Sequence, residues 1–205
     1  MPFVLLIRHG ENDFVKKGRL AGRMPGVHLN DRGIAQANAL AEKLKAAPIK
    51  AIYSSPMERA METAAPIAEA LGLQVIPRDG LLETNFGDWQ NKTLKSLRRR
   101  KLWKIVQGAP SRMRFPGGES FAECQLRIVN EVESLCALHK PKDMLACVFH
   151  SDPIKLAIAY YLGMSLDNFQ RLFISPASIT ALHMSEAGAG LVTMNYDLSL
   201  NFSKS

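Results

Sequence analysis

The chain of 205 residues has no apolar run long enough to cross a membrane as a helix. Its apolar start is too short, and too close to the first residue, for a signal peptide. Its three cysteines have no CxxC spacing, which argues against a zinc site and a disulfide framework. Internal repeats are absent as well. These absences predict one soluble, cytoplasmic domain over residues 1–205, with free and buried thiols.

Acidic residues are too few to balance the basic ones, and the net charge is +7. Such an excess suits nucleic acid, an acidic membrane surface or a small anionic substrate. No nucleic-acid motif with interleaved aromatic residues accompanies the basic blocks, and block 98–101 is typical of a solvated helix face. We therefore expect a small-molecule phosphate ester as the partner, with neither nucleic acid nor a membrane, and a homodimer stays open.

Apolar stretches alternate with segments of helical pattern along most of the chain. Strands are expected at 3–7, 50–53, 73–76, 144–149, about 178–184 and 191–196. Helices are expected from Asp31, from Pro56 to Leu71, from about Lys92 to Val106, from Ser120, and from Ser151 through Leu162. This order predicts an α/β fold: a three-layer sandwich with a mostly parallel central sheet and helices on both faces.

Two of these helices begin at apparent capping boxes, in which a serine precedes a glutamate by three residues. The pairs are Ser55 with Glu58 and Ser120 with Glu123. For Glu119, just before the second box, stabilisation of the helix dipole is a sufficient role. The Pro- and Gly-rich segment 107–118 is expected to form a loop over the site.

Charged side chains follow the buried strands, at the edge where open parallel sheets bind ligands. Arg8 and His9 follow the first strand, Arg59 opens the helix after the second, Glu83 follows the third, and His150 ends the fourth of these stretches. This set suits phosphoryl transfer. The arginines would hold the phosphoryl oxygens, one histidine would attack phosphorus, and the acid would protonate the leaving oxygen.

The combination resembles the histidine phosphatase superfamily, in its phosphoglycerate mutase-like group, over nearly the whole chain. The segments that carry the resemblance are 8–11 (RHGE), 53–60 (YSSPMERA), 82–89 (LETNFGDW), 148–151 (VFHS), 29–37 and 116–120. The resemblance implies His9 as the nucleophile, with Arg8, Arg59 and His150 around the phosphoryl group and Glu83 as the acid. It implies neither a metal nor a cofactor.

The predicted substrate-binding residues combine the phosphate pocket with loop positions. They are Arg8, Asn12, Gly22, Arg59, His150 and Ser151. Many members of the family carry an asparagine that contacts the phosphate where this chain has Val15, and Asn12 is the residue we expect to compensate. Ser151 would present its backbone N–H.

We expect a metal-independent phosphomonoesterase that hydrolyses a small phosphorylated metabolite through a phosphohistidine on His9. Three alternatives stay open: a phosphoglycerate mutase-type transfer, a catalytically idle phosphate-binding module, and nucleic-acid binding. The dedicated mutases of the family are generally longer, so the compact chain favours hydrolysis. Basic residues near the predicted mouth favour a second negative charge on the substrate, as in a sugar phosphate or a phosphoglycerate derivative. They are Lys16, Lys17, Arg19, Arg23, Arg112 and Arg114.

Overall fold

The computed structural model describes residues 2–198, so the ends of the predicted domain 1–205 lie outside the described range. One six-stranded sheet has the order β3-β2-β4-β1-β5-β6. The strands are β1 (Phe3–Arg8), β2 (Ile49–Ser54), β3 (Val75–Pro77), β4 (Met144–Phe149), β5 (Ile179–Ser185) and β6 (Gly188–Tyr196). The first four run parallel, β5 runs antiparallel to β1, and β6 runs antiparallel to β5.

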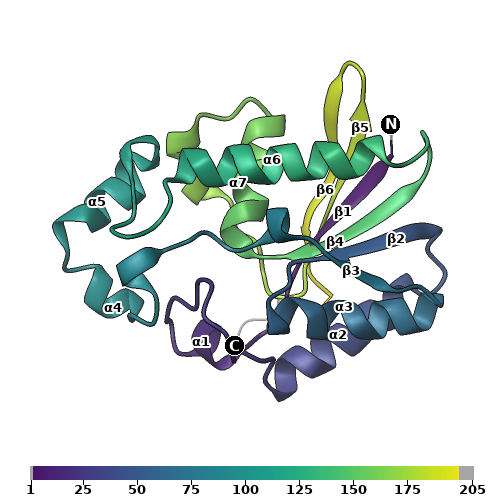
Figure 1. Ribbon diagram of the computed structural model, residues 1–205, viewed down its shortest axis with the longest axis horizontal. Coiled ribbons are helices and arrows are strands. Elements are labelled where there is room, and N and C mark those ends of the chain that lie inside the picture. The colour runs from purple at the N-terminus through teal and green to yellow at the C-terminus, as the bar shows by residue number, and fades with distance from the viewer. Residues whose placement is uncertain (1, 199–205) are drawn as a thin grey trace, which may run out of the picture.

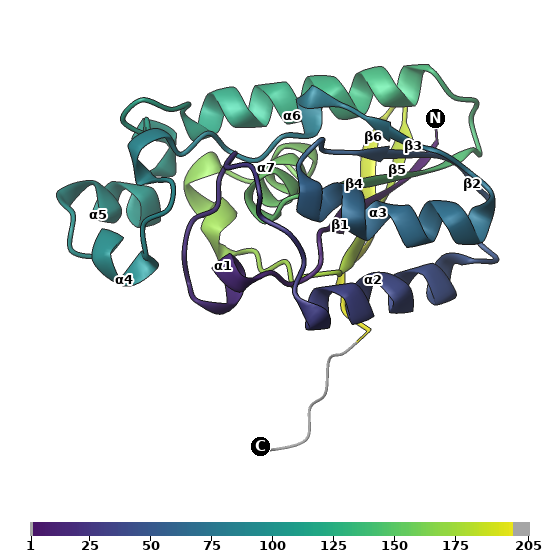
Figure 2. The same cartoon turned by 60° about the horizontal axis from the view of Figure 1, so that its bottom comes forward.

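Helices cover both faces of this sheet, as Figures 1 and 2 show, so the predicted three-layer α/β architecture is confirmed. The helices are α1 (Asp13–Lys16), α2 (Asp31–Leu44), α3 (Glu58–Leu71), α4 (Leu94–Leu97), α5 (Lys101–Gly108), α6 (Phe121–Ala137) and α7 (Ser151–Tyr161). In Figure 1, α2 and α3 lie below the sheet and α6 and α7 above it. Shorter α4 and α5 stand at one end of the molecule.

Strand β1 is apolar throughout because both of its faces are covered. Leu6 packs in the cluster that holds Ile128 of α6 and Ile154 of α7. Its neighbour Ile7 points to the opposite face and packs in the cluster that holds Leu40 of α2. All of these side chains have under 2% of their surface exposed.

A third hydrophobic cluster, here called the aromatic cluster, lies beyond the carboxyl ends of the parallel strands. It joins α5 to the start of α6 and to the segment after α7. Its aromatic members include Phe86, Trp89, Phe115, Phe121 and Phe169, whose rings meet mostly edge to face at centroid distances near 5 Å. Such pairs add to the burial energy of the rings.

The single helix predicted from Lys92 to Val106 is wrong, because the structure divides it into α4 and α5 with an exposed break at 98–100. One continuous helix would extend the buried stripe of Leu94 and Leu97 onto Lys101 and Lys104. The break changes the phase of the stripe, so that Val106 rather than a lysine enters the aromatic cluster.

The capping box predicted at Ser55 and Glu58 is also wrong, whereas the one at Ser120 and Glu123 is present. Helix α3 begins at Glu58 without a side-chain cap, so Pro56 lies before it. Ser55 Oγ instead lies 2.8 Å from His150 Nε2, and Glu58 accepts a hydrogen bond from the N–H of Gly26. Helix α7 begins at Ser151, with His150 rather than Ser151 as its N-cap.

Two glycines allow α2 to pack directly on the loop that follows β1. A Cβ atom on Gly33 would lie 2.0 Å from the carbonyl oxygen of Glu11, and one on Gly10 would lie 2.7 Å from that of Gly33. This backbone contact supports the segment that carries His9.

Replacing Gly33 with Ala tests this contact. In an open helix the change would add about 1 kcal/mol of stability. Here we expect the clash with Glu11 to lower the free energy of unfolding by about 1–3 kcal/mol, measured by urea denaturation. Gly108→Ala is the matched control, because a Cβ at this position in α5 meets no atom within 4 Å. Equal stability of the two variants would contradict the proposed contact.

Candidate active site

A cavity of about 520 Å³ opens between the carboxyl ends of the central strands and the aromatic cluster. Seven of the eight predicted site residues line it. They are Arg8, His9, Asn12, Gly22, Arg59, Glu83 and Ser151. The eighth, His150, is fully buried beside them, with its ring centroid 5.2 Å from that of His9. The structure therefore brings together residues from five distant parts of the sequence.

His9 is held as a neutral imidazole with one nitrogen free. Its Nδ1 lies 2.7 Å from the carbonyl oxygen of Gly10, which can only accept, so Nδ1 carries the hydrogen. Burial lowers the pKa of His9 well below its usual value, and the charges of Arg59 and Arg8 lower it further. Among the described residues, Nε2 has no hydrogen-bond partner. An unprotonated nitrogen thus faces a site of positive potential.

His150 has the opposite tautomer. Arg59 Nη2 donates to its Nδ1 at 3.3 Å, so its Nε2 carries the hydrogen and donates to Ser55 Oγ. Burial, followed by the charge of Arg59, lowers the pKa of His150 well below its usual value. The Ser55 hydroxyl can rotate and donate to Nε2 instead. The ring of His150 can therefore move its hydrogen from Nε2 to Nδ1 and keep Ser55 as its partner at Nε2.

Three buried guanidinium and amide donor atoms around the cavity have no partner within residues 2–198: Arg8 Nε, Arg59 Nη1 and Asn12 Nδ2. A fourth buried donor without a partner, Trp89 Nε1, belongs to the aromatic cluster. The rest of each group is fixed. Arg8 Nη1 donates to the carbonyl of Ile174 and Arg59 Nη2 to that of Gly22, at 2.6 and 2.7 Å. Unpartnered buried donors cost about 1–3 kcal/mol each, so the set favours an anion that accepts from all three.

The amide of Asn12 is oriented by the protein itself. Its Oδ1 accepts from the N–H of Val15 at 2.9 Å, which leaves Nδ2 as the free end. Val15 lines the same cavity but offers no polar side-chain atom. Asn12 therefore offers a free donor to a ligand in the cavity, whereas the Val15 side chain does not.

Glu83 lies at the same end of the cavity, with Oε2 3.9 Å from His150 Nδ1. Burial raises the pKa of its carboxyl group to about 7, and the nearby charge of Asp152 acts in the same direction. The positive charges of Arg59 and Arg8 and the N–H of Thr84 oppose this rise. A carboxyl group with this pKa can both donate and accept a proton near neutral pH.

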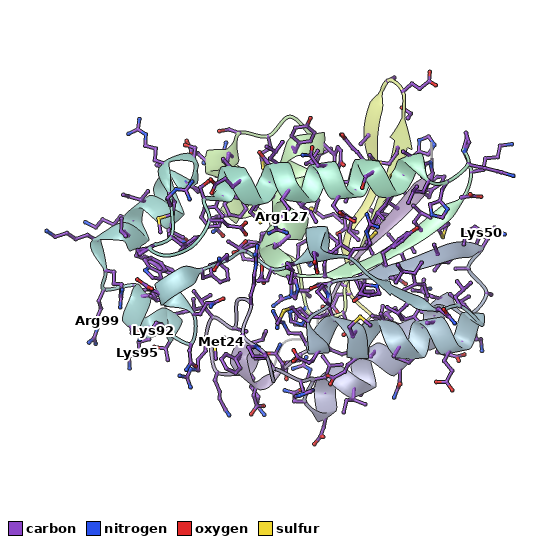
Figure 3. The ribbon with its side chains drawn as sticks, in the orientation of Figure 1. Met24, Lys50, Lys92, Lys95, Arg99 and Arg127 are labelled. Atoms are coloured by element: carbon purple, nitrogen blue, oxygen red, sulfur yellow. The ribbon has the colours of Figure 1, made fainter. Side chains whose placement is uncertain are left out.

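A clamp formed by Arg23, Glu119 and Arg127 holds the backbone of Glu83. Arg23 Nε donates to the carbonyl of Glu83 at 2.7 Å, and Arg127 Nη1 donates to the carbonyls of Gly80 and Leu82. Glu119 Oε1 joins the two guanidiniums at 3.0 and 2.8 Å. In Figure 3, Arg127 lies beneath α6, toward the interior.

This clamp corrects the role expected for Glu119, whose carboxylate binds two arginines and the N–H of Asn85. Contacts of Arg127 and Ser55 at the site were not expected from the sequence either. A lone arginine within the stripe of a long helix, and a serine before a helix, carry no signal of the distant groups that they contact.

The basic residues expected near the mouth take several different roles. Of the six basic residues, all within the described range, Arg19 lines the cavity. Arg23 belongs to the clamp, Lys17 pairs with Asp13, and Arg114 pairs with Glu123. Arg98, assigned to a solvated face, is exposed and also lines the cavity. Lys92, Lys95 and Arg99 extend away from the body of the protein in Figure 3.

Within residues 2–198, no cluster of three His, Cys, Asp or Glu side chains is arranged to hold a metal ion. In the same range, no helix is long and apolar enough to cross a membrane. The three cysteines are free and buried, as predicted, and burial raises the pKa of Cys124 and Cys147. These thiols are therefore poor nucleophiles.

Comparison with known proteins places this chain in a family. The model of the histidine phosphatase superfamily (branch 1) matches residues 4–197. Phosphoserine phosphatase 1 of Hydrogenobacter thermophilus is 29% identical over 197 residues, which cover 95% of this chain and 92% of the relative. The structure of a phosphoserine phosphatase from Entamoeba histolytica, in complex with 3-phosphoglyceric acid, has a TM-score of 0.87 at 28% identity and covers 97% of this chain and 98% of that one.

A third relative bears on the argument from chain length. The 2,3-bisphosphoglycerate-dependent phosphoglycerate mutase of Thermoplasma acidophilum is 32% identical over 189 residues, which cover 89% of this chain and 87% of the mutase. Since a mutase of similar extent exists, a compact chain does not by itself favour hydrolysis, and another criterion is needed.

The assigned tautomers can be tested directly. At about pH 6, His9 should be neutral with the hydrogen on Nδ1, and His150 neutral with the hydrogen on Nε2. His28 is the internal control, because it is exposed and its hydrogen bond to Glu62 raises its pKa, so it should be protonated. Long-range proton–nitrogen NMR correlations, assigned with single His→Gln variants, report all three states. A protonated His9 at this pH would contradict the assignment.

Proposed function

The chain belongs to the histidine phosphatase superfamily (branch 1) and is a phosphatase-type enzyme, and we propose that it hydrolyses phosphate monoesters without a metal, through a phosphohistidine on His9. One observation carries the proposal: the free Nε2 of a neutral, buried histidine lines the same cavity as three unpartnered donors. This arrangement offers a nucleophile and an anion-binding pocket at one place.

In the first step, His9 Nε2 attacks phosphorus in line while the ester P–O bond breaks. Arg8, Arg59 and Asn12 donate to the non-bridging oxygens, and the positive charges of the two arginines match the negative charge of a loose transition state. The bond to the Gly10 carbonyl keeps the hydrogen on Nδ1 and so directs the lone pair of Nε2 to phosphorus. Since charge develops where the donors already point, little reorganisation is needed.

Glu83 supplies the proton that the leaving oxygen needs. With a pKa of about 7, its carboxyl group is protonated in a substantial fraction of molecules near neutral pH. After transfer, the carboxylate accepts a proton from water, whose oxygen attacks phosphorus and breaks the N–P bond. Inorganic phosphate and neutral His9 result. The clamp keeps Glu83 in place through both steps.

His150 acts on the phosphoryl group through Nδ1. When a phosphate oxygen approaches, the hydrogen can pass to Nδ1, provided that Ser55 donates to Nε2 in return. Nδ1 of His150, which accepts a hydrogen bond from Arg59 in the free protein, then becomes a donor to the substrate. Ser151, at the first position of α7, adds the positive end of that helix.

The relative from Thermoplasma keeps a mutase reaction as the second candidate, because the same phosphohistidine could transfer its phosphoryl group to a phosphorylated acceptor. The two reactions differ in their products. Incubation with 3-phosphoglycerate and 2,3-bisphosphoglycerate should give inorganic phosphate from a phosphatase and 2-phosphoglycerate from a mutase. We expect phosphate release to exceed isomerisation.

Replacing His9 with Ala should lower turnover by roughly a thousandfold or more, since no other group can form the covalent intermediate. Brief exposure to radiolabelled substrate should leave an acid-labile, base-stable label on the native protein and none on this variant. His28→Ala is the control and should label normally. Near-native hydrolysis by His9→Ala, with its fold checked by circular dichroism, would rule out the phosphohistidine.

Replacing Glu83 with Gln should slow phosphorylation by an alkyl phosphate roughly a hundredfold or more, and by p-nitrophenyl phosphate less than tenfold, because nitrophenolate leaves without a proton. Rapid-quench measurements isolate this step. With the alkyl ester, the native rate should fall as pH rises above about 7, where Glu83 loses its proton, and the Gln variant should lack this fall. Equal losses for both esters would mean that Glu83 acts by position alone.

A further inference from the structure

Beyond the phosphate-binding end, the cavity continues into what we call the outer chamber, the part that contacts the aromatic cluster and α5. Both tryptophans of the chain, Trp89 and Trp103, line the cavity, as do five of its nine phenylalanines. Aliphatic side chains from the loop before α2 and from α4, Leu20 and Leu94 among them, fill in the wall. A phosphoryl group and a short carbon skeleton need only a small part of 520 Å³, a volume that suits a drug-sized ligand.

The charged side chains of the outer chamber are mostly engaged with the protein. Arg19 donates to the carbonyl of Asn91 and lies over the ring of Phe14. Lys155 pairs with Asp152 at 3.2 Å and lies over the ring of Phe169. Arg98 remains, and it is exposed at the break between α4 and α5. A second anionic group on the substrate would therefore find few uncommitted cations inside.

The apolar wall is also incompletely covered. Phe173 lines the cavity with 76% of its surface exposed, and Trp103, Leu20 and Leu94 are only partly buried. Exposed apolar surface that lines a concave site is typical of a ligand-binding site. A ligand that covers these side chains would gain about 0.8 kcal/mol for each methylene that it buries.

Building on the proposed phosphatase activity, we infer that the substrate is a phosphate monoester whose alcohol carries a bulky apolar group, which enters the outer chamber while the phosphate binds at Arg8 and Arg59. The shape and the wall of the chamber fit an extended alkyl or aryl group. They fit less well the compact, doubly charged skeletons that give the phosphoserine and phosphoglycerate enzymes their names. The second negative charge expected from the basic residues thus has Arg98 as its one uncommitted cation among the residues that line this chamber.

A series of straight-chain alkyl phosphates from ethyl to octyl tests the inference, because the leaving oxygen stays chemically the same along the series. We expect kcat/KM to rise about fourfold per methylene, the ratio that 0.8 kcal/mol corresponds to, until the chamber is full. The total gain should be at least roughly a hundredfold. Phosphoserine and 3-phosphoglycerate serve as the charged comparison and should fall below octyl phosphate.

Variants locate the contact. Phe173→Gln, at an exposed position where folding should not suffer, and Trp103→Phe should each lower the octyl-to-ethyl ratio of kcat/KM, by roughly tenfold for Phe173→Gln. Tyr160→Gln is the matched control: Tyr160 is an aromatic residue of α7, half exposed and outside the cavity lining, so the ratio should not change. An unchanged ratio in Phe173→Gln and Trp103→Phe would overturn the placement of the apolar group.

The possible failures can be told apart. A flat alkyl series, or a preference for phosphoserine or 3-phosphoglycerate over octyl phosphate, would overturn the inference and leave the proposed phosphatase intact. Failure to release phosphate from every ester, including p-nitrophenyl phosphate, would overturn the proposed function and the inference with it.

Discussion

The site depends on two guanidinium groups that have been taken out of water and left incompletely paired. Arg8 and Arg59 are each fixed by one carbonyl, and one further nitrogen of each has no partner in the described part of the chain. Their charge, added to burial, keeps His9 and His150 neutral, while Glu83 is the acid that partly offsets it. An arriving phosphate dianion would satisfy the donors, while the bond from Nδ1 to the carbonyl of Gly10 keeps Nε2 of His9 unprotonated. The same charges thus bind the phosphate and keep the nucleophile available.

The fold holds each of these charged or polar side chains on a segment whose backbone is rigid. His9 follows a central strand covered on both faces, and Gly10 and Gly33 bring α2 against the backbone directly behind it. Arg59 lies in the first turn of α3, where a cation is unfavourable for the helix dipole, and a bound anion would offset this cost. The clamp then restrains Glu83, which lies in a loop and would otherwise move too freely to transfer a proton.

The sequence predicted those features that strand ends and order along the chain determine, namely the sheet, its two helical layers and the residues gathered at its edge. Predictions from local sequence patterns were wrong where a side chain could bond either to its own helix or to a distant residue. Ser55 and Glu58 have the spacing of a capping box, yet both hydrogen bond to residues outside α3. Glu119 precedes a helix, yet its carboxylate joins Arg127 of that helix to Arg23, which is distant in sequence. For Ser55 and Glu119 the tertiary partner won because burial makes an unpaired charge or hydroxyl more costly than a missing cap.

This difference between strand ends and loop side chains also explains why the sequence predicts the chemistry more readily than the substrate. The groups around phosphorus come from strand ends and helix starts, whose relative positions are set by the sheet. The outer chamber is instead built largely by side chains of short helices and loops, where the buried stripe changes phase at 98–100. Its cations bond mostly to other groups of the protein, as Lys155 does to Asp152 and Arg19 to the carbonyl of Asn91. Counting basic residues in such segments predicts a charged mouth, but what a substrate meets is the charge left after internal pairing. In this chamber the protein leaves available an aromatic surface and Arg98, a small part of the net charge of +7.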